Sequence, residues 1–391
     1  MPTIEEESET TVRRRTAEYQ PPRSWRSWLI GRPLRTADAP DQAIGKTVGL
    51  AVFASDALSS TAYATDEILF VLAAAGAAAF VYALPISLAI VVLLAIVTLS
   101  YEQTIHAYPG GGGAYIVARD NLGEFPAQTA GGALLTDYIL TVAVSIASGV
   151  AQLTSAYPSL FPYRVPLAIG LVLFMMLVNL RGVKESGVVF AVPTYFFLGM
   201  LFLTVGSGLA QYLMGGLGAV ENPPHLGKEP LMQSVTLFLI LHAFSNGTTA
   251  LTGVEAISNG VPAFKEPRSR NAGITLVWMS AVLGTLFFGI TFLAGQTGAI
   301  PSETETVISQ LARTIYEGRG YLYIFTIAAT TLILVMAANT AFADFPRLSA
   351  MLAADGFLPR PLTYRGSRLV YSRGIVALAL IASLLIWLFQ A

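Results

Sequence analysis

The chain has 391 residues, of which 54% are hydrophobic and only 12% are charged, and its mean hydropathy is +0.62. Soluble domains carry about 25% charged residues, so this composition excludes an ordinary soluble domain. The net charge of −1 gives no sign of a nucleic-acid-binding surface, and the absence of cysteine excludes disulfides, thiolate ligands and thiol nucleophiles. We therefore predict an all-α polytopic membrane protein.

Residues 1–44 are polar and predict a cytoplasmic tail, whereas 45–391 predict a transmembrane domain. A bilayer is crossed by about 20 apolar helical residues. The segments that meet this requirement are 47–77, 80–106, 128–156, 164–180, 187–213, 231–260, 270–295, 319–345 and 371–390. Most Lys and Arg residues fall on the side of the N-terminus; the exceptions are Arg164, Lys228, Arg313 and Arg319. The positive-inside rule therefore predicts a cytoplasmic N-terminus.

The first span is interrupted by the polar stretch ASDALSSTAYATDE at 54–67. A carboxylate near the middle of a membrane costs several kcal/mol, so Asp56 is expected to be paired, solvated or functional. Alternatively, Asp56 caps a helix in water at the cytoplasmic mouth. Tyr63 lies about two turns further on and can present its hydroxyl group on the same side. Asp66 and Glu67 fit a polar, partly wet outer half of the helix.

The third span carries a polar stripe. Asp137, Thr141 and Ser145 recur every four residues, and Ser148 and Gln152 continue the pattern. At about 100° per residue, positions four apart drift by only about 40° around a helix. Hydroxyl groups alone are typical of helix packing, but the carboxylate that begins this stripe favours a face that lines a cavity.

The sixth span is also broken, because Gly247, Gly253 and Gly260 interrupt it, with Thr252 and Glu255 among them. Its SNGTTA segment echoes SDALSS in the first span, and five spans separate the two breaks. Discontinuous helices at matching positions of two halves are typical of transporters built from inverted repeats. We predict a first repeat at about 45–213 and an incomplete second repeat at about 231–391.

Three further features have plainer interpretations. His242 is expected to pack or hydrogen-bond rather than to catalyse, and Asp344 in the polar part of the eighth span is expected to pair with Arg347. The segment YPGGGGAYIVARDNLG at 108–123 lacks the Gly-Lys-Ser/Thr of a P-loop. It is interpreted either as a flexible cytoplasmic loop or as a backbone that packs closely against the moving helices.

The polar groups within the spans are carboxylates, hydroxyls and backbone carbonyls, without a matching set of Lys or Arg. Hard oxygen ligands with net negative charge suit a cation that loses its water shell. A carboxyl group in a dry site can also carry a proton. These residue types therefore favour a cation pathway over an anion pathway.

The broken first span, the Pro-Gly-Gly-Gly-Gly-Ala-Tyr loop and TGVEAISNGV in the sixth span resemble the amino acid–polyamine–organocation superfamily. Within it, ASDALSSTAYATDEIL and LTDYILTVAVS resemble KimA-type members of the KUP family of potassium–proton symporters. The resemblance implies an inverted-repeat core in a bacterial-type plasma membrane, a homodimer, and potassium and protons as cargo without a cofactor. The potassium-site positions that it implies are Asp56, Tyr63, Asp137, Tyr138, Thr141, Ser145, Thr252 and Glu255.

The expected function is proton-coupled potassium uptake by alternating access, with Glu255 in proton coupling. The alternative is an amino acid or amine permease of the same superfamily, although no glycine stands in the first break to bind a substrate carboxylate. An enzyme is not expected, because no nucleophile–base or metal-ligand spacing occurs. The resemblance also implies a tenth helix and a C-terminal domain beyond Ala391, so we expect the sequence to be truncated.

Overall fold

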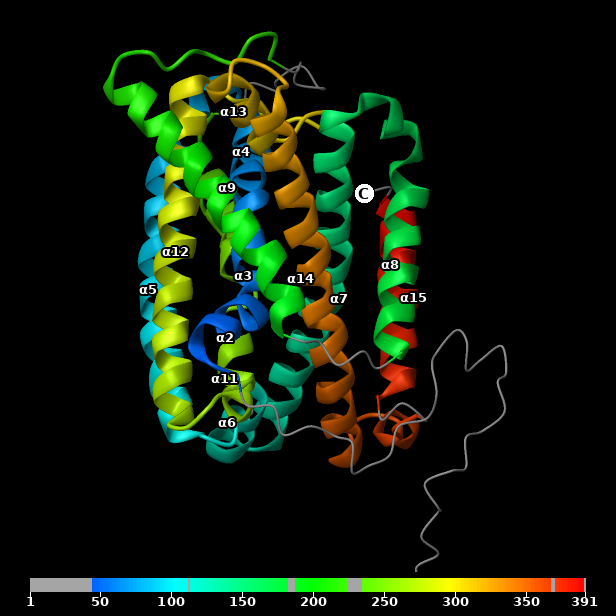
Figure 1. The fold of residues 1–391 in the computed structure, drawn as a ribbon. Coiled ribbons are helices and arrows are strands. Elements are labelled where there is room, and N and C mark those ends of the chain that lie inside the picture. The colour runs from blue at the N-terminus through cyan, green and yellow to red at the C-terminus, as the bar shows by residue number, and fades with distance from the viewer. Residues whose placement is uncertain (1–43, 112, 182–186, 224–233, 367–369, 390–391) are drawn as a thin grey trace, which may run out of the picture.

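The computed structural model describes residues 44–111, 113–181, 187–223, 234–366 and 370–389 (Figure 1). The predicted tail at 1–44 lies outside these residues except for Ile44. The described α-helices are α2 (Lys46–Phe53), α3 (Ser55–Ser59), α4 (Ala64–Leu72), α5 (Ala83–Ala107), α6 (Gly113–Leu122), α7 (Glu124–Ala156), α8 (Arg164–Leu180), α9 (Gly187–Leu213), α10 (Leu237–Gly247), α11 (Ala256–Asn259), α12 (Arg268–Thr297), α13 (Val307–Ile315), α14 (Tyr321–Ala354) and α15 (Ser372–Phe389).

Eight helical segments in the described part of the chain are long and apolar enough to cross a membrane. They correspond to the second through ninth predicted spans. The first predicted span is present as the short helices α2, α3 and α4, none of which is long enough to cross alone. The prediction of an all-α membrane protein with an interrupted first span is thus confirmed.

Several predicted boundaries differ from the helix ends in the structure, those of the first and eighth spans among them. The first span was expected to reach residue 77, but α4 ends at Leu72 and a 3₁₀ turn follows. The eighth was expected to end at residue 345, but α14 continues to Ala354. Asp344 and Arg347 form the expected pair across one helical turn of this part, with Oδ1 and Nη1 3.6 Å apart, and Leu348 and Leu352 are buried there.

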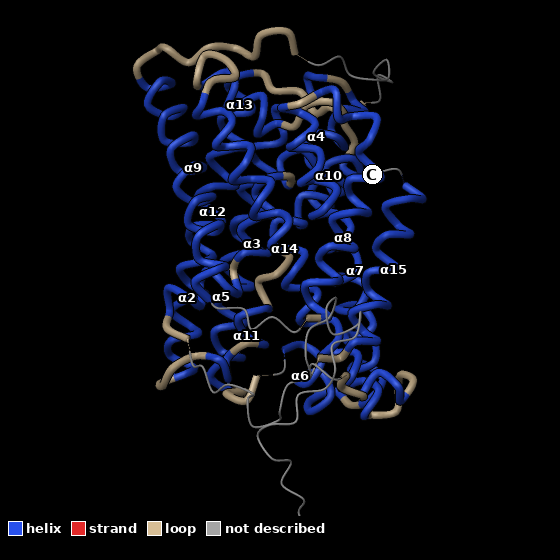
Figure 2. The backbone as a smooth tube through the Cα atoms, turned by 45° about the vertical axis from the view of Figure 1, so that its right-hand side comes forward, coloured by secondary structure: helices blue, strands red, loops and turns tan. Residues whose placement is uncertain are grey.

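The two halves of the chain pack span against span. Helix α4 contacts α10, α5 contacts α12, α7 contacts α14 and α8 contacts α15. Each of the first four spans thus lies beside the span five places later. We call the interrupted first span, α2 to α4, the first column, and the interrupted sixth span, α10 to α11, the sixth column. The first column rises from α2 to α4, whereas the sixth descends from α10 to α11, so the two broken columns are antiparallel (Figures 1 and 2). This pairing is the arrangement expected of inverted repeats.

Both broken columns expose backbone inside the protein. In the first column, α3 is followed by a 3₁₀ turn over Ser60–Ala62. Tyr63, the next residue, has a φ of −133°, which is not helical. In the sixth, Thr252 is extended with ψ 143°, and Gly253 is left-handed with φ +79°. Residues 55–62 are buried, as are Gly253 and Val254. Unwound backbone is tolerated in a bilayer when protein covers it in this way.

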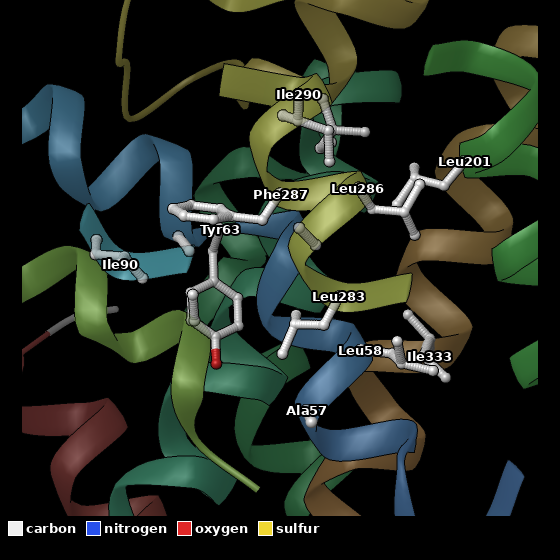
Figure 3. Close-up of a cluster of buried hydrophobic side chains, with 14 of the residues drawn as sticks. Ala57, Leu58, Tyr63, Ile90, Leu201, Leu283, Leu286, Phe287, Ile290 and Ile333 are labelled. Atoms are coloured by element: carbon white, nitrogen blue, oxygen red, sulfur yellow. The ribbon is translucent and has the colours of Figure 1, made fainter. Parts of the chain in front are cut away.

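An apolar core holds the broken columns against α5 and α12. Leu283, Phe287 and Ile290 of α12 are almost fully buried in the same cluster as Ala57 and Leu58 of α3 (Figure 3). Such burial contributes roughly 1.5–3 kcal/mol per large side chain in water. Within a membrane, close packing supplies most of this stabilisation instead.

The segment at 108–123 is mostly helical, because α6 begins at Gly113. The expectation of a flexible loop is therefore wrong for this part. Gly111 adopts φ +75°, and a Cβ atom there would lie 2.7 Å from the backbone oxygen of Asn259 at the end of α11. The alternative expectation, a backbone that packs closely against the broken sixth column, is confirmed.

We predict that Gly111→Ala lowers the thermal stability of the purified protein. A left-handed alanine costs about 1–2 kcal/mol, and the contact with Asn259 adds to this cost. Gly110→Ala is the matched control, because a Cβ atom at Gly110 meets nothing within 4 Å. Equal melting temperatures for the two variants in a thermal-shift assay would contradict the close packing of this loop.

Candidate ion-binding site

Asp56 lies in the first turn of α3, and its residue is only 4% exposed. Its Oδ1 atom is buried without a hydrogen-bond partner among the described residues, whereas the hydroxyl group of Thr340 on α14 interacts with the carboxyl group. The alternative of a solvated cap at the cytoplasmic mouth is therefore wrong. Leaving one oxygen of a buried carboxylate unpaired is costly, and such an atom calls for a functional explanation.

The backbone of the broken sixth column forms the wall beside Asp56. A Cβ atom on Gly253 would lie 2.8 Å from both Asp56 Oδ2 and the Ala57 nitrogen. The Ser60 hydroxyl donates to the Ala250 carbonyl at 3.0 Å. The two breaks therefore contact each other directly, and glycine at 253 is required both by its positive φ and by this contact.

The polar stripe of α7 reaches the same region. Thr141 and Ser145 are buried, and Ser145 Oγ has no hydrogen-bond partner among the described residues. Asp137, at the start of the stripe, is half-buried, and its charge acts on the Asp56 carboxylate. Thr141 and Ser145 of the predicted stripe thus point into the protein and not toward its surface.

The outer half of the stripe has a different role. Gln152 is buried, and its Oε1 accepts a hydrogen bond from the Thr306 hydroxyl at 2.9 Å, just before α13. Ser148 is half-buried between the two regions. Helical spacing alone predicted one face of α7, but it could not show that another segment binds the outer end of that face.

Tyr63 and Thr252 connect the broken columns above Asp56. The Tyr63 hydroxyl lies near the Thr252 side chain, and Thr252 Oγ1 donates to the Thr249 carbonyl at 2.9 Å. Figure 3 shows the Tyr63 hydroxyl pointing away from Phe287 and Ile290. Tyr63 therefore joins the apolar core on one side and offers an oxygen on the other.

Glu255 and Tyr138 complete the set of predicted residues. Glu255 follows the sixth-column break and is 9% exposed, and its charge acts on Asp56. Tyr138 is buried, and its hydroxyl accepts from Asn259 Nδ2 at 3.4 Å. The structure thus gathers the acids of α3, α7 and the sixth column in one region, and Asp344 of α14 adds a further charge.

Sequence reasoning missed several contributors. Thr249 Oγ1 is another buried oxygen without a partner in the described chain, and its position inside the SNGTTA break was the available signal. The Thr340 contact with Asp56 joins residues far apart in sequence, so no local pattern could predict it. His242 is exposed beside the Phe238 ring, as a packing role implies.

The arrangement of these oxygens suits a monovalent cation. Among the described residues, no three acidic, histidine or cysteine side chains converge as ligands of one metal ion. Asp56 Oδ1 and Ser145 Oγ are buried oxygens without a hydrogen-bond partner among the described residues, and oxygens of this kind are ligands for a cation. Few carboxylates combined with neutral oxygens favour an alkali cation over a divalent one.

Comparison with known proteins places the chain in a transporter family. The model of the family described as "Amino acid permease" matches residues 45–391. The potassium transporter KimA of Bacillus subtilis is 49% identical over 366 residues, which cover 94% of this chain and 60% of KimA.

Two further relatives share less of the chain. The cationic amino acid transporter 6 of Arabidopsis thaliana is 27% identical over 50% of this chain and 33% of its own length. The low affinity potassium transport protein Kup of Pectobacterium carotovorum is 30% identical over 39% of this chain and 24% of its own. The chain thus spans 60% or less of the length of these relatives. The family match over 45–391 agrees with the antiparallel broken columns and the pairing of spans, so the chain belongs to the amino acid permease family of membrane transporters.

Proposed function

We propose that the protein takes up potassium together with protons by alternating access. The observation that carries the proposal is the pair of buried oxygens at the centre of the fold, Asp56 Oδ1 and Ser145 Oγ, that lack hydrogen-bond partners among the described residues. A dehydrated potassium ion supplies the missing partner of both atoms. The printed name of KimA, a potassium transporter, supports this cargo.

The remaining predicted residues take roles that their positions support. Tyr63, Thr141 and Thr252 offer neutral oxygens, Tyr138 lies on the same region of α7, and Asp137 adds negative charge. Glu255 is the proton carrier in this proposal, because it is buried near Asp56 and lies directly after the break of the sixth column. The unwound segments around Tyr63 and Gly253 are the hinges about which the two columns move.

The proposal includes the setting of the protein. The excess of Lys and Arg on one side supports a cytoplasmic N-terminus, and we propose a bacterial-type plasma membrane as the location. The resemblance to KUP-family symporters supports a homodimer of the intact protein.

A second candidate function is the transport of a cationic amino acid or amine. The similarity to a cationic amino acid transporter supports it. The first-column break, however, has no glycine between Ala51 and Leu72, so it lacks the bare backbone typical of a carboxylate-binding break. An amine without a carboxylate remains compatible with the acids of the site.

We predict that Asp56→Asn abolishes growth of potassium-uptake-deficient cells at limiting potassium. Loss of the charge partner of a buried ion reduces transport by at least roughly 100-fold. Asp120→Asn, which removes an exposed carboxylate that pairs with Arg119 at the surface, is the matched control and leaves growth unchanged. Failure of the unmodified protein to support growth, or full rescue by Asp56→Asn, would contradict potassium transport at this site.

Uptake of an amine that potassium does not inhibit would favour the second candidate.

Ser145→Ala tests whether the Ser145 hydroxyl binds the ion or only contributes to stability. Because Ser145 Oγ is buried without a partner, its removal leaves the ion-free protein as stable or stabilises it. If this oxygen binds potassium, the half-saturating concentration for uptake of radioactive rubidium rises about 3- to 10-fold. An unchanged half-saturating concentration in a variant that is expressed normally would remove Ser145 from the site.

Glu255→Gln tests the coupling. The amide cannot carry a proton, so we expect potassium exchange across proteoliposomes to persist while accumulation driven by an imposed proton gradient is lost. Expression and exchange activity of the same variant report whether the site is intact. Gradient-driven accumulation equal to that of the unmodified protein would exclude Glu255 as the proton carrier.

A further inference from the structure

Asp66 makes a contact that the ion site does not explain. It lies on α4, the half of the first column beyond Tyr63, and is only 7% exposed. Its Oδ1 accepts a hydrogen bond at 3.1 Å from the backbone nitrogen of Val307, the first residue of α13. The expectation that Asp66 lies in a partly wet region is therefore wrong. A carboxylate at this position also interacts favourably with the positive end of the helix dipole.

Helix α13 is fastened to the other helices around the site. The Thr306 backbone nitrogen donates to Ser155 Oγ of α7 at 3.1 Å, next to the bond between Thr306 and Gln152. Ser309 Oγ lies 2.9 Å from the Tyr323 hydroxyl on α14. Most of α13 is buried, and it lies across the same end of the bundle as α4 (Figure 1).

Helix α13 contacts two kinds of element, long helices, α7 and α14 among them, and the short helix α4 of the first column. The contacts with α7 and α14 connect it to long, unbroken helices. Within the segment, Arg313 pairs with Glu305 at 3.1 Å, so its own structure does not depend on α4. Among the hydrogen bonds of the described residues, Asp66 to Val307 is the one that joins α13 to the half-helix of the first column.

We propose that Asp66 is a positioning residue that latches the outer gate of the transporter. While its carboxylate binds the N-terminus of α13, α4 is held against that helix, and the path to Asp56 from this side is closed. Breaking the contact lets α4 move away from α13 about the hinge at Tyr63. The proposal rests on the alternating access and the membrane orientation proposed above. The latch consists of the Asp66 carboxylate and the Val307 backbone N–H group.

The absence of cysteine from the 391 residues allows a direct test. Ser148→Cys introduces a thiol on α7 between Ser145 of the site and Gln152 below α13, where the side chain is half-buried. In cells that express the intact protein, a membrane-impermeant maleimide then reports whether the path is open from outside. Any cysteine outside these residues is replaced first.

Asp66→Asn and Val307→Pro test the two sides of the latch separately. The amide keeps an oxygen but loses the charge, whereas proline removes the N–H group. Proline is tolerated at the first position of a helix, and Thr306 before it has φ −68° and ψ 156°, which suit a residue before proline. Glu67→Gln is the matched control, because Glu67 is the adjacent acid on α4 and its side chain has no hydrogen bond or ion pair within the described residues.

We expect each latch variant to label roughly 10-fold faster than the Ser148→Cys parent, as loss of a charge-assisted hydrogen bond implies. Combining both changes should add little, since they break the same contact. The Glu67→Gln control should label at the parental rate. Thermal melting of each variant confirms that the labelled protein is folded.

Parental labelling rates in folded Asp66→Asn and Val307→Pro would overturn the latch and leave Asp66 as a structural residue. Equal acceleration in Glu67→Gln would overturn it as well, because the effect would not be specific to the contact. Acceleration only with a membrane-permeant maleimide would overturn the outward position of the gate. Because labelling needs no potassium, these outcomes are independent of the test of the transported cation.

Discussion

The structure depends on the contact between the Asp56 carboxyl group and the backbone of Gly253. It joins two helices at the points where both are broken, and it allows no Cβ atom at 253. A buried carboxylate with one free oxygen is destabilising, and so is unwound backbone in a membrane. The two destabilising features occur at the same place, and such a combination is typical of functional sites.

The rest of the fold surrounds this contact. Helices α5 and α12 pack an apolar core against the broken columns, α14 brings Thr340 to Asp56, and α7 buries Ser145 inside the bundle. The glycine loop packs against Asn259 at one end of the sixth column, while Asp66 binds α13 at the far end of the first. Each broken column is thus held at one end by a contact with a neighbouring element, the sixth by the glycine loop and the first by α13.

The sequence predicted much of this arrangement because membranes impose strong rules. The spans followed from apolar runs, the two breaks from glycines and polar residues within them, and the stripe from Asp137 to Ser145 from helical spacing. Contacts between distant segments were not accessible in the same way. The Thr340 contact with Asp56 and the Val307 contact with Asp66 depend on how whole helices pack, and nothing local to either residue encodes them.

The central claim is that Asp56 and Ser145 bind the transported cation, and the most direct measurement is the anomalous scattering of crystals of the intact protein grown with thallium, a potassium substitute. The account predicts the strongest anomalous peak in the membrane region next to Asp56 Oδ1 and Ser145 Oγ, and its disappearance in Asp56→Asn. A dominant peak away from both atoms, or the same peak in Asp56→Asn, would contradict it.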